Sequence, residues 1–265
     1  MNNKFFIYFF LFFFINSYAY SLEFKGEFTE GALIKGKANK ETKIFIDNQP
    51  LKISKTGLFV FGIEKGKKNI VIDVYEKDEK KTLIKKIKKR NFLVQKINNL
   101  PKKMVTPGKK ELERIKKEQV FFDKMRTVNS DDIFFYSNFI RPAEGIISGR
   151  FGSQRILNGK PRRPHLGMDI ANKKGTPIKA SASGTVTLAK KDLYFTGDTI
   201  GIEHGHGITS VYYHLNSINV VEGQKIIQGD IIGTMGSTGR ATGDHLHFGI
   251  YWIKNPVDPE LVLKN

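Results

Sequence analysis

The strongest constraint on the fold of this chain lies after Arg141, where short apolar runs alternate with glycine-rich turns. Examples are TPIKASASGTVTLAK (176–190), DTIGIEHGHGITSVYYHL (198–215) and HLHFGIYW (245–252). Strand-length apolar runs between turn signals, with few helical periods, predict an all-β domain, and we place it at residues 141–265. The chain has no cysteine, so its stability must come from its core or partly from a bound metal.

Residues 22–98 predict a second, smaller β domain. LKISKTGLFVFGI (51–63) holds two apolar stretches around a Lys-Thr-Gly turn, and KNIVIDVYEKDEKKTLIKKI (68–87) repeats that pattern. About five to seven strands fit this length, which favours a β-sandwich. The strand number and turn spacing resemble the small immunoglobulin-like modules that precede exported peptidases.

Residues 99–140 differ in character and predict a basic linker with one helix. The stretch KKELERIKKEQVFFDKMRTV (109–128) follows a Pro-Gly pair and has a helical apolar period. The expected apolar face consists of Leu112, Ile115, Gln119 and Phe122. We therefore expect a mainly β protein in which an amphipathic helix packs against the last domain.

The N-terminus has the pattern of a secretory signal peptide, residues 1–19. Lys4 precedes an unbroken apolar run of 11 residues (5–15), and Ser17-Tyr18-Ala19 then fits a small-x-small cleavage site. The alternative is a short membrane anchor, but a spanning helix needs about 20 residues. We expect cleavage after Ala19 and export to the periplasm or cell envelope, without lipid attachment because no lipobox cysteine is present.

The net charge of +18 is concentrated in the first half of the chain. Residues 1–141 contribute +14 and residues 142–265 contribute +4, mostly through lysines such as those in KKTLIKKIKKRNF (80–92). Export and the lack of an aromatic-interleaved recognition motif argue against nucleic acid. Contact with an anionic envelope surface is one interpretation. A simply solvated, lysine-rich strand face is equally favoured, because charge runs are weak evidence for a partner.

The histidines carry the chemistry of this sequence. All six fall in the last domain, at positions 165, 204, 206, 214, 245 and 247. In a strand, His245 and His247 point to the same face. A catalytic zinc takes three protein ligands and leaves one position open. His165 and Asp169, four residues apart in RPHLGMDIAN (163–172), supply the imidazole and carboxylate that such a site needs.

Three spaced motifs resemble the signature of the lysostaphin/LytM-type zinc metallopeptidases, whose β domain is of the duplicated hybrid motif type. They are His165-x3-Asp169, Tyr212-x-His214-Leu215 and His245-Leu246-His247, and the resemblance covers roughly residues 140–258. The sequence departs from the family pattern at Asp244, where proline is frequent, and at Gly249, where glutamate is frequent. Neither position is expected to bind metal.

The resemblance implies a role for each matching residue. His165, Asp169 and His247 would bind one Zn²⁺ per chain, while His214 and His245 would be the catalytic histidines. Zinc would activate a water molecule that attacks a peptide carbonyl; one histidine would help stabilise the oxyanion and the other would relay protons. The sequence leaves open which histidine is the general base.

Other polar residues receive weaker assignments. Tyr212 shares a strand face with His214 and is a candidate for substrate binding, although a core or rim position is equally compatible. Arg155 is a second candidate, because an arginine can bind a substrate carboxylate bidentately, although an exposed, solvated arginine is the favoured interpretation. His204 and His206 repeat the His-x-His spacing between glycines, which favours surface residues in a hairpin turn.

We therefore interpret the chain as an exported zinc metalloendopeptidase that hydrolyses the peptide cross-links of bacterial peptidoglycan. The alternative is a non-catalytic LytM-like regulator that activates a cell-wall amidase, although such proteins usually lack one or more ligands. A wall-binding module based on residues 22–98 is a further possibility. The sequence does not define the bond cut, the oligomeric state or whether the N-terminal region inhibits, targets or only spaces.

Overall fold

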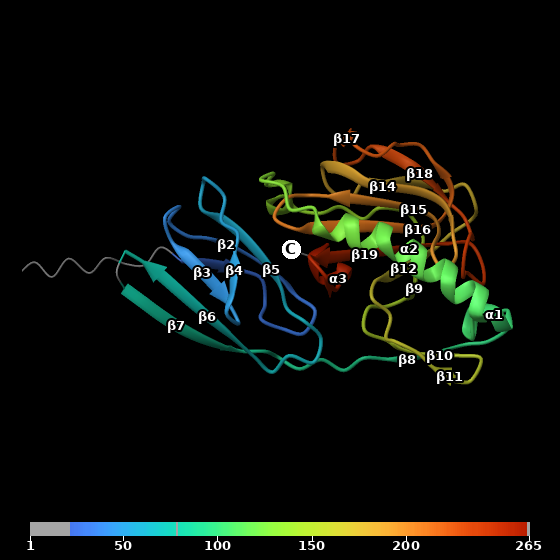
Figure 1. Ribbon diagram of the computed structural model, residues 1–265, viewed down its shortest axis with the longest axis horizontal. Coiled ribbons are helices and arrows are strands. Elements are labelled where there is room, and N and C mark those ends of the chain that lie inside the picture. The colour runs from blue at the N-terminus through green and yellow to red at the C-terminus, as the bar shows by residue number, and fades with distance from the viewer. Residues whose placement is uncertain (1–21, 78, 264–265) are drawn as a thin grey trace, which may run out of the picture.

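The computed structural model describes residues 22–77 and 79–263, which form two β units and a connecting segment (Figure 1). The expected signal peptide, residues 1–19, lies outside the described residues. Among the described residues, no helix is long and apolar enough to cross a membrane. The mainly β fold class predicted from the sequence is confirmed.

The N-terminal unit is a two-sheet sandwich. One antiparallel sheet has the order β1-β2-β5 and the other has the order β4-β3-β6-β7. Their bounds are β1 (Glu23–Lys25), β2 (Leu33–Lys37), β3 (Lys43–Ile46), β4 (Gln49–Leu51), β5 (Leu58–Gly62), β6 (Asn69–Glu76) and β7 (Glu79–Lys86). Apolar side chains alternate inward along these strands, so that Ile34, Phe59, Phe61 and Ile72 form part of one buried cluster between the sheets.

The connecting segment crosses to the C-terminal unit and runs along it. It contains β8 (Val94–Ile97), α1 (Lys102–Val105), α2 (Lys109–Thr127) and the 3-10 helix η1 (Phe134–Tyr136). Strand β8 lies within the range expected for the first domain, yet it pairs in parallel with β10 (Gln154–Leu157), which pairs in turn with β11 (Lys160–Pro161). The segment therefore contributes a strand to a small sheet beside the C-terminal unit.

Helix α2 covers the C-terminal sheet, as the sequence predicts, but its buried face is displaced from the predicted one. Met125 is fully buried and packs with Val211, Tyr213 and neighbouring apolar side chains, while Leu112 is 55% exposed. The predicted face omitted Met125 because the apolar residues of this helix, including Phe121 and Val120, do not follow a single stripe.

The C-terminal unit is built on a ten-stranded, antiparallel sheet whose main path is β17-β14-β15-β16-β19-β12-β9. Its elements are β9 (Ile146–Gly149), β12 (Met168–Ala171), β13 (Pro177–Lys179), β14 (Gly184–Leu193), β15 (Gly197–Glu203), β16 (Ile208–Ile218), β17 (Lys225–Ile226), β18 (Ile231–Met235), β19 (His245–Trp252), β20 (Asn255–Val257) and helix α3 (Pro259–Val262). Strands β16 and β19 lie centrally and are buried along most of their length.

The two β units share part of their packing. Leu33 and Val60 of the N-terminal sandwich belong to the same buried cluster as Val257 and Val262 of the C-terminal unit. Trp252, the one tryptophan of the chain, packs against the cores of both units. At the rim of this contact, Arg90 forms an ion pair of 2.6 Å with the buried carboxylate of Asp258. The units are therefore joined by a continuous apolar contact.

Candidate metal centre and active site

Pairing between β12 and β19 creates the centre of the site. In this antiparallel ladder Asp169 lies directly opposite His247, so the two side chains point to the same face of the sheet. His165 precedes β12 and its backbone is tied to the loop after β9 by a hydrogen bond from the His165 N–H to the Ser153 carbonyl. Three residues that span 82 positions of the chain are thus brought together by one strand pair and one adjacent loop.

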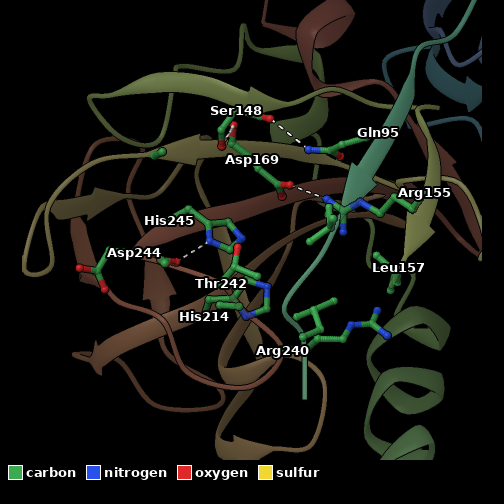
Figure 2. Close-up of a pocket in the computed structure, with 15 residues that line it drawn as sticks. Gln95, Ser148, Arg155, Leu157, Asp169, His214, Arg240, Thr242, Asp244 and His245 are labelled. Carbon is green, nitrogen blue, oxygen red and sulfur yellow. Dashed lines mark hydrogen bonds and ion pairs between the residues drawn. The ribbon is translucent and has the colours of Figure 1, made fainter. Parts of the chain in front are cut away.

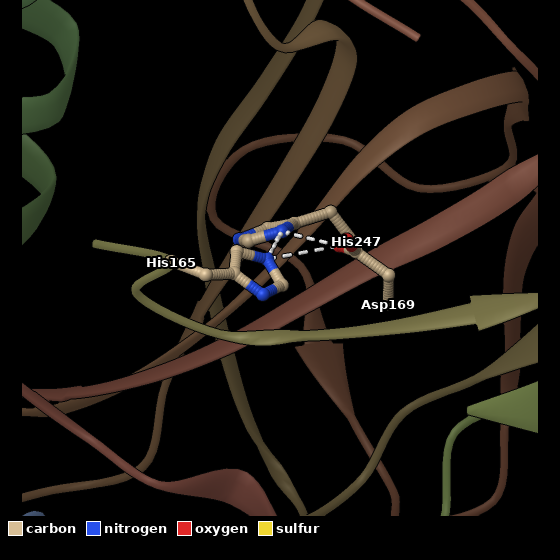
Figure 3. Close-up of side chains that lie close together, drawn as sticks. All are labelled: His165, Asp169 and His247. Atoms are coloured by element: carbon tan, nitrogen blue, oxygen red, sulfur yellow. Dashed lines mark hydrogen bonds and ion pairs between the residues drawn. The ribbon is translucent and has the colours of Figure 1, made fainter. Parts of the chain in front are cut away.

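The three side chains converge on a single point (Figure 3). His165 Nε2 lies 2.9 Å from His247 Nδ1, and both nitrogens lie within 3.0 Å of Asp169 Oδ1. All three residues are buried, and among the described residues they form the group that can offer three ligand atoms to one ion. Ligands around a tetrahedral zinc are separated by roughly 3.3 Å, given Zn–N distances near 2.1 Å. The donor set and its spacing therefore fit a small divalent cation.

The protonation states suit metal binding. Burial opposes the ionisation of Asp169, but hydrogen bonds with His165 and His247 outweigh it and hold the pKa of this carboxyl well below its usual range. Burial lowers the pKa of His247 to about 4, against the opposing effect of Asp169. At neutral pH the cluster consequently presents an ionised carboxylate and a neutral His247 imidazole, the forms that coordinate metals.

Surrounding groups fix the orientation of the cluster. The Nδ1–H of His165 donates to the carbonyl of Arg150 at 3.1 Å, which leaves its Nε2 lone pair facing the centre. Arg155 Nη2 donates to the other carboxylate oxygen of Asp169. A Cβ at Gly149 would lie 2.3 Å from that oxygen, and one at Gly167 would lie 2.8 Å from the His247 ring. Glycine at both positions allows the backbone to approach the site this closely.

His214 and His245 form a second pair beside the cluster. Their ring centroids are 4.7 Å apart, and the ring of His214 lies 6.3 Å from that of His247. Each donates its Nδ1–H to a backbone carbonyl, of Thr238 and Gly243 respectively, so each Nε2 carries a free lone pair. Burial, and next to it His245 and His247, lower the pKa of His214 to about 3. His214 is therefore a neutral imidazole at neutral pH, and its Nε2 lone pair faces the site.

The backbone at His214 is strained. This residue adopts a φ of +65°, a conformation that costs a side-chain-bearing residue about 1–3 kcal/mol. The hydrogen bond from the His214 N–H to the Thr196 carbonyl holds this backbone in place. The strain turns the His214 ring into a pocket of about 260 Å³ that also exposes Asp169 and His245 (Figure 2). Gln95, from β8, lines the far wall of this pocket.

The expected substrate contact through Tyr212 is wrong. Its ring is fully buried in the core and its hydroxyl accepts a hydrogen bond from the Ser181 N–H at 2.9 Å. The neighbouring Tyr213 lies on the site face instead, where its ring stacks on that of His247 at 5.0 Å with an interplanar angle of 7°. The left-handed conformation of His214 breaks the strict alternation that the sequence-based assignment of Tyr212 assumed.

The surface positions expected for His204 and His206 are also wrong. Both side chains are buried, and His204 bonds through Nδ1 to the carbonyl of Ser183 while its Nε2 lies 2.8 Å from Ser210 Oγ. The ring of His206 packs against Phe135 of the connecting segment, with centroids 4.7 Å apart. Because the connecting segment covers this turn, these histidines are structural core residues, away from the metal cluster.

Comparison with known proteins agrees with this geometry. The profile of peptidase family M23 matches residues 163–259, a range that contains every residue of the cluster and both neighbouring histidines. The C-terminal unit is a peptidase family M23 domain. The LytM-type resemblance seen in the sequence is thereby confirmed.

Two curated proteins are similar in sequence to this M23 domain. The DD-carboxypeptidase/endopeptidase Mpg of Neisseria meningitidis serogroup B is 41% identical over 98 residues, which are 37% of this chain and 22% of the relative. The peptidoglycan DD-endopeptidase ShyA of Vibrio cholerae is 38% identical over 113 residues, 42% of this chain and 26% of the relative. The chain thus spans about a quarter of the length of the curated relatives that it matches.

A solved structure extends the fold comparison beyond the M23 domain. A crystal structure described as an M23 peptidase from Pseudomonas aeruginosa has a TM-score of 0.63, with 24% identity, and covers 90% of this chain and 96% of that chain. At this level of identity the likeness shows the fold alone. It includes the N-terminal β unit as well as the M23 domain, so the arrangement of both units is shared.

Proposed function

We propose that this protein is an exported zinc metalloendopeptidase that hydrolyses peptide cross-links in bacterial peptidoglycan. The observation that carries the proposal is the convergence of His165, Asp169 and His247 on one point, with His214 and His245 beside it, inside an M23 domain. A regulator without activity would need none of these five side chains in working order. Here the cluster is complete and its donor atoms face one another.

The metal would be held by His165, Asp169 and His247, and when bound it would supply a Lewis acid for hydrolysis. His214 and His245 lie on the open side of the cluster with Nε2 lone pairs available. One of them would accept a proton from the attacking water at Nε2, and the other, when its Nε2 carries a proton, would donate a hydrogen bond to the developing negative charge on the peptide carbonyl. Tyr213 stabilises the His247 ring by stacking.

We infer the substrate from the names of the relatives and the location from the N-terminal sequence. The relatives named as endopeptidases of peptidoglycan support a cross-link as substrate, and the DD specificity in their names favours a D-alanyl–diaminopimelate bond. Such a substrate lies outside the cytoplasm, in agreement with the signal-peptide pattern of residues 1–19. Exposed lysines such as Lys86 on β7 support an additional contact with an anionic envelope polymer.

Digestion of purified sacculi tests this function. The chain without residues 1–19 is loaded with zinc, and released muropeptides are identified by mass spectrometry beside the His245→Ala variant and a chelator-treated sample. We expect new uncross-linked peptides from the wild type alone, one zinc per chain in both proteins, and recovery of the chelated sample on zinc addition. Stoichiometric zinc without new muropeptides would contradict the proposal and favour the amidase-activating regulator.

A further inference from the structure

A second pocket, of about 440 Å³, opens beside the metal cluster and is unusually cationic. His165, His214 and His247 form part of its wall, so it is continuous with the site. Its lining includes four arginines, Arg155, Arg162, Arg163 and Arg240. Among the described residues that line this pocket, none carries a carboxylate. Four guanidinium groups around one cavity, without an acid in its wall, make this pocket attractive to an anionic ligand.

Two of these arginines, Arg162 and Arg240, are in contact with neutral groups rather than with carboxylates. Arg162 Nη2 donates to the backbone carbonyl of Val105 at 2.7 Å, and Arg240 Nη1 makes a long contact of 3.4 Å with the carbonyl of Met104. The Arg240 guanidinium also lies 4.4 Å above the ring of Phe195. These neutral groups satisfy donors, but they do not compensate the positive charges.

Electrostatic repulsion among the arginines of this pocket is consistent with an uncompensated positive charge. Burial lowers the pKa of Arg240 to about 10, and the neighbouring Arg155 and Arg162 lower it further in the same direction. Two acids, Asp169 and Asp244, line the adjoining 260 Å³ pocket together with Arg155 and Arg240. The second oxygen of Asp169 is already bound to Arg155, and the ion pairs of the described residues include none between Asp244 and an arginine. Asp169 serves the metal cluster, so Arg162 and Arg240 retain charges that a ligand can neutralise.

We propose that Arg240 and Arg162, supported by Arg155, form a subsite for a free carboxylate of the substrate peptide next to the bond that is cut. The proposal rests on the proposed peptidase function and specifies its substrate class. In a D-alanyl–diaminopimelate cross-link, the carbon attached to the scissile nitrogen carries such a carboxylate. Planar guanidinium groups bind carboxylates bidentately, which fixes orientation as well as charge. The subsite thus selects peptides with a carboxylate over the corresponding amides.

A matched pair of peptides tests this selection. Both contain the D-alanyl–diaminopimelate bond, and they differ in whether the diaminopimelate carboxyl next to the scissile nitrogen is free or amidated. Cleavage is measured with the zinc-loaded mature chain, and binding is measured by calorimetry with its zinc-loaded His245→Ala variant. A charge-assisted hydrogen bond of about 1.5–3 kcal/mol predicts a preference of about 10- to 100-fold for the free carboxylate, in kcat/KM and in Kd.

Variants of Arg240 test whether the arginines of this pocket cause the preference for the free carboxylate. Arg240→Gln should lower cleavage of the free carboxylate peptide much more than cleavage of the amide, so that the preference falls by about tenfold. Arg240→Lys should keep part of the preference. The control Arg141→Gln removes one charge outside the pocket, where the side chain bonds to the Ala143 and Gly145 carbonyls, and should leave both rates unchanged.

The outcomes separate the two proposals. Equal cleavage and equal binding of the two peptides by the wild type would overturn the subsite and leave the peptidase function standing. An equal loss on both peptides in Arg240→Gln would also overturn it, because the residue would then act through the fold. Carboxylate-dependent binding without cleavage would support the subsite and contradict the peptidase function.

Discussion

Each side chain of the metal cluster depends on a neighbour for its working form. Asp169 stays ionised because His165 and His247 bond to its carboxylate, and His165 presents Nε2 because its Nδ1 is bonded to a carbonyl. The sequence predicts which residues meet, since its three spaced motifs resemble those of the LytM-type peptidases. It does not predict the tautomers or the partner of Asp169, because these depend on loops that are distant in the chain.

Removing the carboxylate of the cluster tests its role as a ligand. The neutral amide of Asp169→Asn coordinates zinc poorly, so we expect zinc affinity to fall by more than about 100-fold, as even outer partners of metal ligands contribute 10- to 100-fold. The measurement is zinc retention in competition with a chromogenic chelator. Asp192→Asn, a matched change of charge at an exposed position of β14, should bind zinc like the wild type. Stoichiometric zinc in Asp169→Asn would show that another group holds the ion.

The buried His204 makes stability depend on pH. Burial lowers its pKa to about 4 from 6.5, although its hydrogen bond to Ser183 acts in the opposite direction. Between pH 6.5 and 4 the unfolded chain binds a proton at this position and the folded chain does not. Folding stability from this residue is therefore complete above pH 6.5 and declines on acidification, by about 1.4 kcal/mol per pH unit and about 3 kcal/mol in all.

Urea titrations of the wild type and of His204→Gln between pH 4 and pH 7 check this dependence. The variant lacks the titrating group, so its free energy of unfolding should fall less steeply with decreasing pH. The difference in slope should correspond to the uptake of about one proton on unfolding. Other buried histidines contribute to both curves and cancel in the comparison. Parallel curves would refute the assignment to His204, whatever the stability of the variant at neutral pH.

Among the structural elements, the strands themselves are easier to predict from the sequence than the pairing between strands or the points where their alternation ends. The period of two in HLHFGIYW correctly places His245 and His247 on one face, because β19 is a regular central strand. The same period misplaces Tyr212, because the left-handed turn at His214 ends the alternation. The contribution of β8 to the pocket is not visible in its sequence, since parallel pairing with β10 leaves no local pattern.

Helix α2 supports the site from behind, through Met125 and through Phe122, whose ring meets that of Tyr213 edge-on. Met125 is completely buried and packs with Tyr213, whose ring stacks on His247. We expect Met125→Ala to lower the free energy of unfolding by about 2–4 kcal/mol, since truncation leaves a cavity beneath the sheet. Leu112→Ala truncates a 55% exposed side chain of the same helix and should change stability by less than about 0.5 kcal/mol. Urea denaturation measures both values, and equal losses would contradict the observed buried face.

At the scale of the whole molecule, the two β units share a buried apolar contact, and we expect them to unfold together. Leu33 and Val60 complete the buried cluster of the M23 domain, and Trp252 lies between the two cores. Separating the units would expose this apolar contact to water, which is unfavourable in proportion to its area. Removal of residues 22–98 would therefore destabilise the M23 domain as well as remove β8 from its pocket.

The ion pair between Arg90 and Asp258 gives this coupling a sharp test. Asp258 is buried and caps α3 by accepting from the Glu260 N–H, so Arg90→Gln leaves a buried carboxylate without its cation. The expected cost is about 3 kcal/mol, and a subsequent Asp258→Asn change should recover part of it, because the charge itself is then removed. In urea titrations of Arg90→Gln, the unfolding midpoints measured by Trp252 fluorescence and by far-ultraviolet circular dichroism should fall together. Both signals should then report a single transition. If the circular dichroism separated into two transitions while Trp252 followed one of them, the units would be independent domains, and the contact around Trp252 would hold them together without coupling their folding.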